Sequence, residues 1–186
     1  MRTSRSTESS RTRRESKASA AAAGSVLSVA RVATGRPRLR STEALGAKAL
    51  LLGRRSYEFL AARWPSRSGP FADRLNSLPK YVVSSTLDAP VWNNTTVIRG
   101  DVINKVSKLK REIDGDILVA ASFQLWHMLM EHDLVDELRL MIYPVVLGAG
   151  ERLFGEGSEK KPMRLVSTRT VDDLALLIYE LVPLSS

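Results

Sequence analysis

Short, uninterrupted apolar runs that alternate with helix-like segments constrain the fold of this chain more than any other feature. Residues 49–52 are Ala-Leu-Leu-Leu, residues 81–83 are Tyr-Val-Val, and residues 117–120 are Ile-Leu-Val-Ala. Apolar runs of this length are typical of strands that are buried on both faces of a sheet. With a further strand expected at residues 95–98, the middle of the chain is predicted to form the centre of a sheet.

The segments between these strands have the composition and the end signals of helices. Helices are predicted at residues 55–64, 71–78, 101–111 and 122–132. Alternation of strand and helix requires a largely parallel sheet that is covered on both faces. A strand at residues 137–147, interrupted by Pro144, and an antiparallel pair at residues 163–170 and 174–182 complete the sheet. We therefore expect an α/β fold with a mixed, mostly parallel sheet, helices on both faces and an antiparallel C-terminal hairpin.

The net charge of +8 is concentrated at the N-terminus, because residues 1–40 contain ten Arg or Lys and only two Glu. The remaining residues have balanced charges, so the body of the chain is not a basic binder of polyanions. Residues 1–24 are too polar to bury a core, although residues 25–34 have enough apolar side chains for one short strand. We predict a basic extension at residues 1–40, disordered or not native, followed by one domain at residues 41–183. An export signal and a nucleic-acid-binding arm are the alternatives for the extension.

Other classes of site are excluded by composition. The chain contains no cysteine and only two histidines, which excludes disulfides, thiolate metal sites and a multi-histidine centre. No metal is therefore expected. No apolar run approaches the roughly 18 residues of a membrane-spanning helix. The absence of cysteine fits a reducing compartment, so a cytoplasmic location without membrane contact is expected.

Ligands bind at the carboxyl ends of the strands in sheets of this kind, so the residues that follow each apolar run are candidates for a site. Gly53 follows the first run and allows a ligand to approach the backbone closely. Arg54 or Arg55 can bind a phosphate, and Ser56 adds a hydroxyl at the start of a helix whose free amides favour an anion. The alternative interpretation is two solvated arginines on a capped helix.

Two further strand ends carry hydroxyl or small side chains. Ser84, Ser85 and Thr86 follow the second run, and their three hydroxyls can bind a phosphate or a ribose, although such hydroxyls also stabilise turns. Ala120, Ala121 and Ser122 lead from the third run directly into a helix, a geometry that suits a pyrophosphate. The glycines that would bring backbone amides into contact with that group are absent from this third strand end.

These strand ends, taken together with their surroundings, resemble a known family. The similarity is carried by four stretches, at residues 51–58, 80–87, 92–101 and 134–150. They resemble the dihydrofolate-reductase-like fold, in the group named for the reductase domain of the bifunctional riboflavin-biosynthesis deaminase-reductase. The resemblance extends over about residues 41–182 and implies a three-layer α/β fold.

What the resemblance implies is a reductase that uses NADPH, similar to 5-amino-6-(5-phosphoribosylamino)uracil reductase. Members are commonly homodimers, and the implied substrate is a pyrimidine- or pterin-like small molecule. From the resemblance and the strand-end pattern together, we expect nine residues to bind the cofactor. They are Gly53, Arg54, Arg55, Ser56, Ser84, Ser85, Ala120, Ala121 and Ser122.

One departure from the family concerns catalysis. Members begin with a strand that ends in Ser-Leu-Asp-Gly, and its acid lies near the substrate. The first aspartate of this chain is Asp73, and the acids before Gly53 are Glu8, Glu15 and Glu43, none of which ends a plausible strand. The catalytic residue is therefore unassigned, and slow turnover is expected. The alternatives are a non-catalytic, dimeric NADP-binding protein and a nucleic-acid-associated protein that acts through its basic tail.

Overall fold

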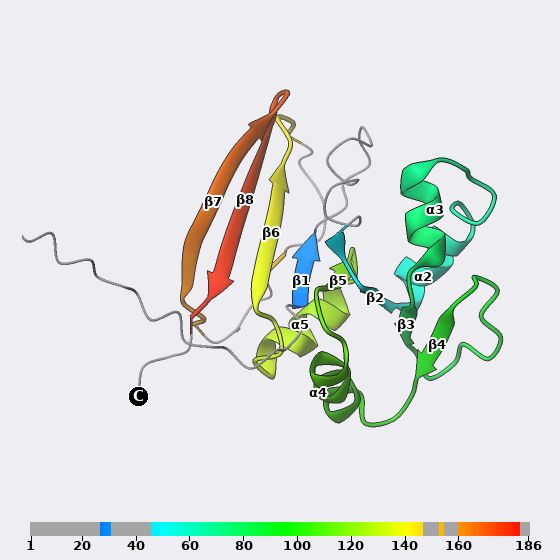
Figure 1. The fold of residues 1–186 in the computed structure, drawn as a ribbon. Coiled ribbons are helices and arrows are strands. Elements are labelled where there is room, and N and C mark those ends of the chain that lie inside the picture. Colours follow the sequence, from blue (N-terminus) through cyan, green and yellow to red (C-terminus); the bar gives the residue numbers. More distant parts are fainter. Residues whose placement is uncertain (1–26, 31–45, 147–152, 155–159, 183–186) are drawn as a thin grey trace, which may run out of the picture.

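One mixed sheet organises the protein, whose computed structural model describes residues 27–30, 46–146, 153–154 and 160–182. Within these ranges, eight strands form the sheet in the order β4-β3-β2-β5-β1-β6-β8-β7 (Figure 1). The strands are β1 (Leu27–Ala30), β2 (Ala49–Gly53), β3 (Lys80–Val83), β4 (Thr95–Ile98), β5 (Ile117–Ala120), β6 (Glu137–Ile142), β7 (Met163–Val171) and β8 (Leu174–Leu181).

The pairing of these strands confirms the mixed, mostly parallel sheet. Strands β1 to β6 pair with one another in parallel. Strand β8 pairs antiparallel with both β6 and β7, which makes β7 and β8 the C-terminal hairpin. The sheet therefore has a parallel centre, and the carboxyl ends of its parallel strands lie at one edge.

Helices cover both faces of the parallel part, as expected. They are α2 (Arg54–Ala61), α3 (Pro70–Ser77), α4 (Val102–Glu112) and α5 (Phe123–Glu131). One core joins α2 and α3 to the sheet, with Leu75 packed in the same cluster as Leu52. The other core joins α4 and α5 to the opposite face, where Val106 and Trp126 belong to the cluster that contains Leu51. Because side chains of neighbouring strand residues point to opposite faces, the apolar run of β2 serves both cores.

Local signals account for the ends of several elements. The Asp101 side chain accepts a hydrogen bond from the backbone N–H of Asn104 and caps α4. Strand β6 is shorter than predicted, since it ends at Ile142 instead of continuing to residue 147. The cause is Pro144, which has no N–H to donate to a neighbouring strand.

The short strand expected within residues 25–34 is confirmed as β1, which lies between β5 and β6. The sheet thus includes residues on the N-terminal side of the boundary predicted at residue 40. Residues 1–26 and 31–45 lie outside the described residues, so the division into an extension and a domain stays a prediction. Across the part of the chain that the structure describes, no helix is both long and apolar enough to cross a membrane.

Candidate functional site

A cavity of about 440 Å³ lies at the carboxyl ends of β2, β3 and β5. Its walls are formed by Gly53, Arg54, Arg55, Ser56, Val83, Ser84, Ser85, Thr86, Ala121, Ser122, Phe123, Gln124, Leu125 and Met128. The structure therefore brings eight of the nine predicted site residues together at one place. The ninth, Ala120, is buried in the core of the α2 side and does not line the cavity.

The first wall is the turn from β2 into α2. Gly53 is the last residue of β2 and the N-cap of α2. Because glycine has no side chain, no side chain of the N-cap residue caps this helix. The first amides of a helix have no partner within the helix, and they carry the positive end of its dipole. Because α2 begins at Arg54 and Gly53 and Arg54 both line the cavity, this end of the helix favours an anion there.

Arg54 is held in place at the rim of the cavity. Its Nε donates to a carboxylate oxygen of Glu58 at 2.7 Å, one helical turn away. Its Nη1 donates to the hydroxyl of Thr86, which follows β3. The side chain is about half exposed, so the ion pair is screened and the guanidinium keeps donors for a ligand. Among the described residues, Arg55 has no ion-pair partner, although it lines the same cavity.

The second wall is a turn that Ser84 stabilises. Its Oγ accepts hydrogen bonds from the backbone N–H groups of Thr86 and Leu87, at 3.2 and 3.0 Å. The side chain is 9% exposed, whereas Ser85 and Thr86 are exposed at the cavity. The turn-stabilising role expected as the alternative for Ser84 is therefore present, and the turn presents the next two hydroxyls to the cavity.

The third wall is the turn from β5 into α5. Ala121 has a φ of 51°, in the left-handed region that favours glycine, and Ser122 is the N-cap of α5. The Ser122 hydroxyl accepts the backbone N–H of Gly53 at 2.9 Å and lies 2.9 Å from the Ser56 hydroxyl. The N-terminal ends of α2 and α5 are thus joined beside one cavity.

Comparison with known proteins identifies the family. Residues 39–177 match the family described as the RibD C-terminal domain, and this range is most of the chain. The chain belongs to the RibD C-terminal domain family. The expected resemblance to the reductase domain of the riboflavin-biosynthesis enzyme is confirmed.

Two relatives of this RibD C-terminal domain protein come from Bacillus subtilis strain 168. The uncharacterized protein YyaP is 32% identical over 126 residues, which cover 65% of this chain and 66% of YyaP. The uncharacterized protein YwjB is 28% identical over 130 residues, which cover 70% of this chain and 71% of YwjB. Both alignments therefore span about two thirds of the relatives' own length.

Solved structures show the same fold. A putative riboflavin biosynthesis protein from Shewanella sp. PV-4 superposes with a TM-score of 0.65 at 17% identity, covering 86% of this chain and 99% of that one. Dihydrofolate reductase from Enterococcus faecalis, complexed with NADP(H), superposes with a TM-score of 0.59 at 14% identity, covering 86% and 97%. At these identities the likeness establishes the dihydrofolate-reductase-like fold.

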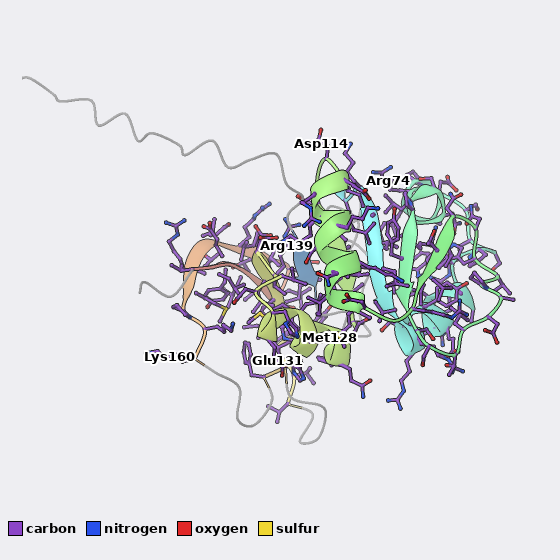
Figure 2. The ribbon with its side chains drawn as sticks, turned by 90° about the horizontal axis from the view of Figure 1, so that it is seen from below. Arg74, Asp114, Met128, Glu131, Arg139 and Lys160 are labelled. Carbon is purple, nitrogen blue, oxygen red and sulfur yellow. The ribbon has the colours of Figure 1, made fainter. Side chains whose placement is uncertain are left out.

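The cavity of this RibD C-terminal domain also includes side chains that were not predicted from the sequence. They are Val83, Phe123, Gln124, Leu125 and Met128, whereas the Thr86 hydroxyl was expected there with those of Ser84 and Ser85. Met128 lies on α5, where Figure 2 labels it. Its spacing of four residues from Gln124 places both on one helix face, a signal that the sequence does contain.

No metal centre is indicated at this cavity. Within the described ranges, no cluster of three or more His, Cys, Asp or Glu side chains could hold a metal ion. His127, one of the two histidines, instead forms a 2.8 Å hydrogen bond between its Nε2 and the carbonyl oxygen of Leu153. The cavity walls combine apolar side chains with hydroxyls, guanidinium groups and helix N-termini.

Proposed function

We propose that this protein is an NADPH-dependent reductase of the riboflavin-biosynthesis type, similar to 5-amino-6-(5-phosphoribosylamino)uracil reductase. Its substrate would be a pyrimidine- or pterin-like small molecule, and it would act in the cytoplasm as a homodimer. The observation that carries the proposal is the convergence of the α2 and α5 N-termini and two arginines on one cavity. Helix N-termini and arginines together bind the phosphates of dinucleotides in other folds.

The residues present fit such a cofactor. Gly53 has a φ of −77°, a value that any residue adopts, so the backbone does not require glycine there. A Cβ added at Gly53 would lie 3.5 Å from the nearest side-chain atom, the Oγ of Ser122, which is ordinary contact. Neither conformation nor packing explains the glycine, whereas close approach of a bound phosphate to the backbone does.

The proposal assigns a role to each wall of the cavity. The N-termini of α2 and α5, including the backbone of Ala121 and Ser122, would hold the pyrophosphate. Arg54 and Arg55 would hold a phosphate on the adenosine side, with the hydroxyls that follow β3. The cofactor, when bound, supplies a hydride, and the protein must position the acceptor and provide a proton.

The test is the affinity for NADPH and NADH, measured by fluorescence titration. We expect NADPH to bind about ten- to a hundredfold more tightly, because a charge-assisted contact to the 2′-phosphate contributes roughly 1.5–3 kcal/mol. Arg54→Ala should remove most of this preference. Arg63→Ala is the matched control, since the Arg63 guanidinium stacks on Phe59 at 3.6 Å and Arg63 does not line the cavity. Equal affinity for both cofactors in the unaltered chain would contradict the assignment of Arg54.

A non-catalytic NADP-binding protein is the second candidate, and one observation favours it. Residues 31–35, which follow β1, are Arg-Val-Ala-Thr-Gly and contain no acid. A chain without a proton donor at that position would bind NADPH without oxidising it at an appreciable rate. Cofactor binding without oxidation, across a panel of pyrimidine and pterin substrates, would support this candidate over the reductase.

A further inference from the structure

The hydroxyl of Ser122 lies at the centre of a hydrogen-bond chain that joins two neighbouring strand ends. The last backbone register pair between β2 and β5 is Leu51 with Val119. Beyond it, the N–H of Gly53 is bound by the Ser122 Oγ at 2.9 Å, so a side chain continues the connection between the two strands. Ser122 is 7% exposed, although it borders the cavity.

The donors and acceptors of this chain have a fixed direction. The Gly53 N–H can only donate, so Ser122 accepts it. The Ser56 hydroxyl donates to the Ala121 carbonyl at 2.8 Å, since a carbonyl can only accept. The Ser122 proton is therefore directed to the Ser56 oxygen at 2.9 Å, with the Ala120 carbonyl 3.0 Å away as a second acceptor.

The chain connects the two features that form the proposed phosphate site. At one end is Gly53, the N-cap of α2, and at the other is the carbonyl of Ala121, whose left-handed conformation turns the backbone into α5. The Ser122 hydroxyl has its proton and an acceptor position occupied by protein groups. It is thus poorly suited to binding a cofactor directly, but well suited to fixing α2 relative to α5.

We propose that Ser122 is a positioning residue, which acts with Ser56 to hold the N-termini of α2 and α5 at the separation that a pyrophosphate requires. The proposal rests on the proposed function and changes the role of Ser122 within it, from direct ligand to the joint between two ligand-binding turns. Arg54, Arg55 and the turn after β3 lie outside this hydrogen-bond chain. A defect in the joint should therefore affect binding of the pyrophosphate and not that of the 2′-phosphate.

The test compares two probes, NADPH and 2′-AMP, which carries the 2′-phosphate but no pyrophosphate. Ser122→Ala should weaken NADPH binding about tenfold, as expected for the loss of one well-placed hydrogen bond. The same variant should leave 2′-AMP affinity within about twofold of the unaltered chain. Ser122→Thr, which retains a hydroxyl, should restore NADPH binding. Ser77→Ala is the matched control, because Ser77 is exposed on α3 and, within the described structure, its hydroxyl bonds only the Arg74 carbonyl.

Ser56→Ala tests the same joint if Ser122→Ala does not fold. Since the two hydroxyls act in one chain, the double variant should bind NADPH no more weakly than Ser122→Ala alone. NADPH affinity unchanged in Ser122→Ala, or an equal loss for both probes, would overturn the positioning role and leave the proposed function standing. An unaltered chain that binds 2′-AMP but neither NADPH nor NADH would overturn both.

Discussion

Ala121 occupies a backbone conformation that an L-residue adopts at a cost. Its φ of 51° lies in the left-handed region, which costs an alanine roughly 1–2 kcal/mol. Glycine avoids this cost, although its greater freedom in the unfolded chain opposes the gain by roughly 0.5–1 kcal/mol. Ala121→Gly should therefore raise the free energy of unfolding by up to about 1 kcal/mol, as measured by urea denaturation.

Ala120→Gly is the control for this prediction. Ala120 is the last residue of β5, is buried and has no positive φ, so glycine there brings only the entropic cost and the loss of a buried methyl. It should lower the free energy of unfolding by about 1 kcal/mol. If the two variants destabilised the protein equally, the strain assigned to Ala121 would be wrong.

Lys80 is a buried cation without a carboxylate partner among the described residues. Its Nζ donates to the carbonyl oxygens of Asn76, Leu78 and Asn93 at 2.9, 2.7 and 3.2 Å, and lies 4.4 Å from the ring centroid of Trp92. The ammonium therefore connects the end of α3 to the loop before β4. Lys80→Met should lower the free energy of unfolding by about 1–3 kcal/mol, because the three carbonyls lose their donor.

The same side chain predicts a pH dependence. Burial lowers the pKa of Lys80 from 10.5 to about 8. Between these two values the unfolded chain binds more protons than the folded chain, so the contribution of Lys80 to the free energy of unfolding rises with pH. Urea denaturation of the unaltered chain and of Lys80→Met should show their difference growing from about pH 8 to about pH 10.5. A constant difference would mean that the three carbonyls hold the pKa near its ordinary value.

At the scale of elements, the position of β1 bears on the reaction that we propose for the site. It lies between β5 and β6 and is parallel to both, with Ala30 opposite Ala120 and Arg139. Its carboxyl end is therefore at the same edge of the sheet as the cavity. Because β1 and residues 31–35 contain no acid, proton delivery would come from water, and we expect slow NADPH oxidation with pyrimidine or pterin substrates.

Adding a carboxylate at the end of β1 should raise that rate. The variants are Ala30→Asp, at the last residue of β1, and Arg31→Asp, at the next residue along the chain. One of them should accelerate NADPH oxidation by about a hundredfold, the lower range for a positioned general acid. Ala30→Asn and Arg31→Asn are the controls, because an amide has a similar shape but supplies no proton. Rapid NADPH oxidation by the unaltered chain would show that another acid reaches the site.

The elements that could be predicted from the sequence are those with strong local signals. The runs of β2 and β5 are continuous and apolar, so the existence of both strands followed from pattern alone, and the cavity lies at their ends, where the pattern indicated. The place of β1 in the sheet did not follow, because strand order depends on contacts between distant residues. The contact of Arg54 with Thr86 and the joint through Ser122 were missed for the same reason, as each crosses between elements.

At the scale of the whole molecule, the sheet extends beyond the helices. Figure 1 shows β6, β8 and β7 continuing past the part of the sheet that α2 to α5 cover. Leu165 of β7 lies opposite Tyr179 of β8, which in turn lies opposite Leu138 of β6, so these three side chains share one face. Leu138 is fully buried, whereas Leu165 is 50% exposed. The apolar face that α5 covers at Leu138 thus continues onto the hairpin and becomes half-exposed at Leu165.

In the proposed homodimer, we expect a second copy of the chain to cover this face. Ile142, which is 51% exposed, lies on the same face as Leu138 because it is four residues further along β6. Burial of such side chains stabilises an interface, and a lysine at its centre opposes association. Leu165→Lys should therefore shift the protein from dimer to monomer in sedimentation equilibrium, with its circular dichroism spectrum unchanged.

Ser167→Lys is the control, because it places the same charge on the other face of β7, opposite Ile178, and should leave the dimer intact. An unaltered chain that sediments as a monomer, or equal dissociation of both variants, would contradict an interface at this face.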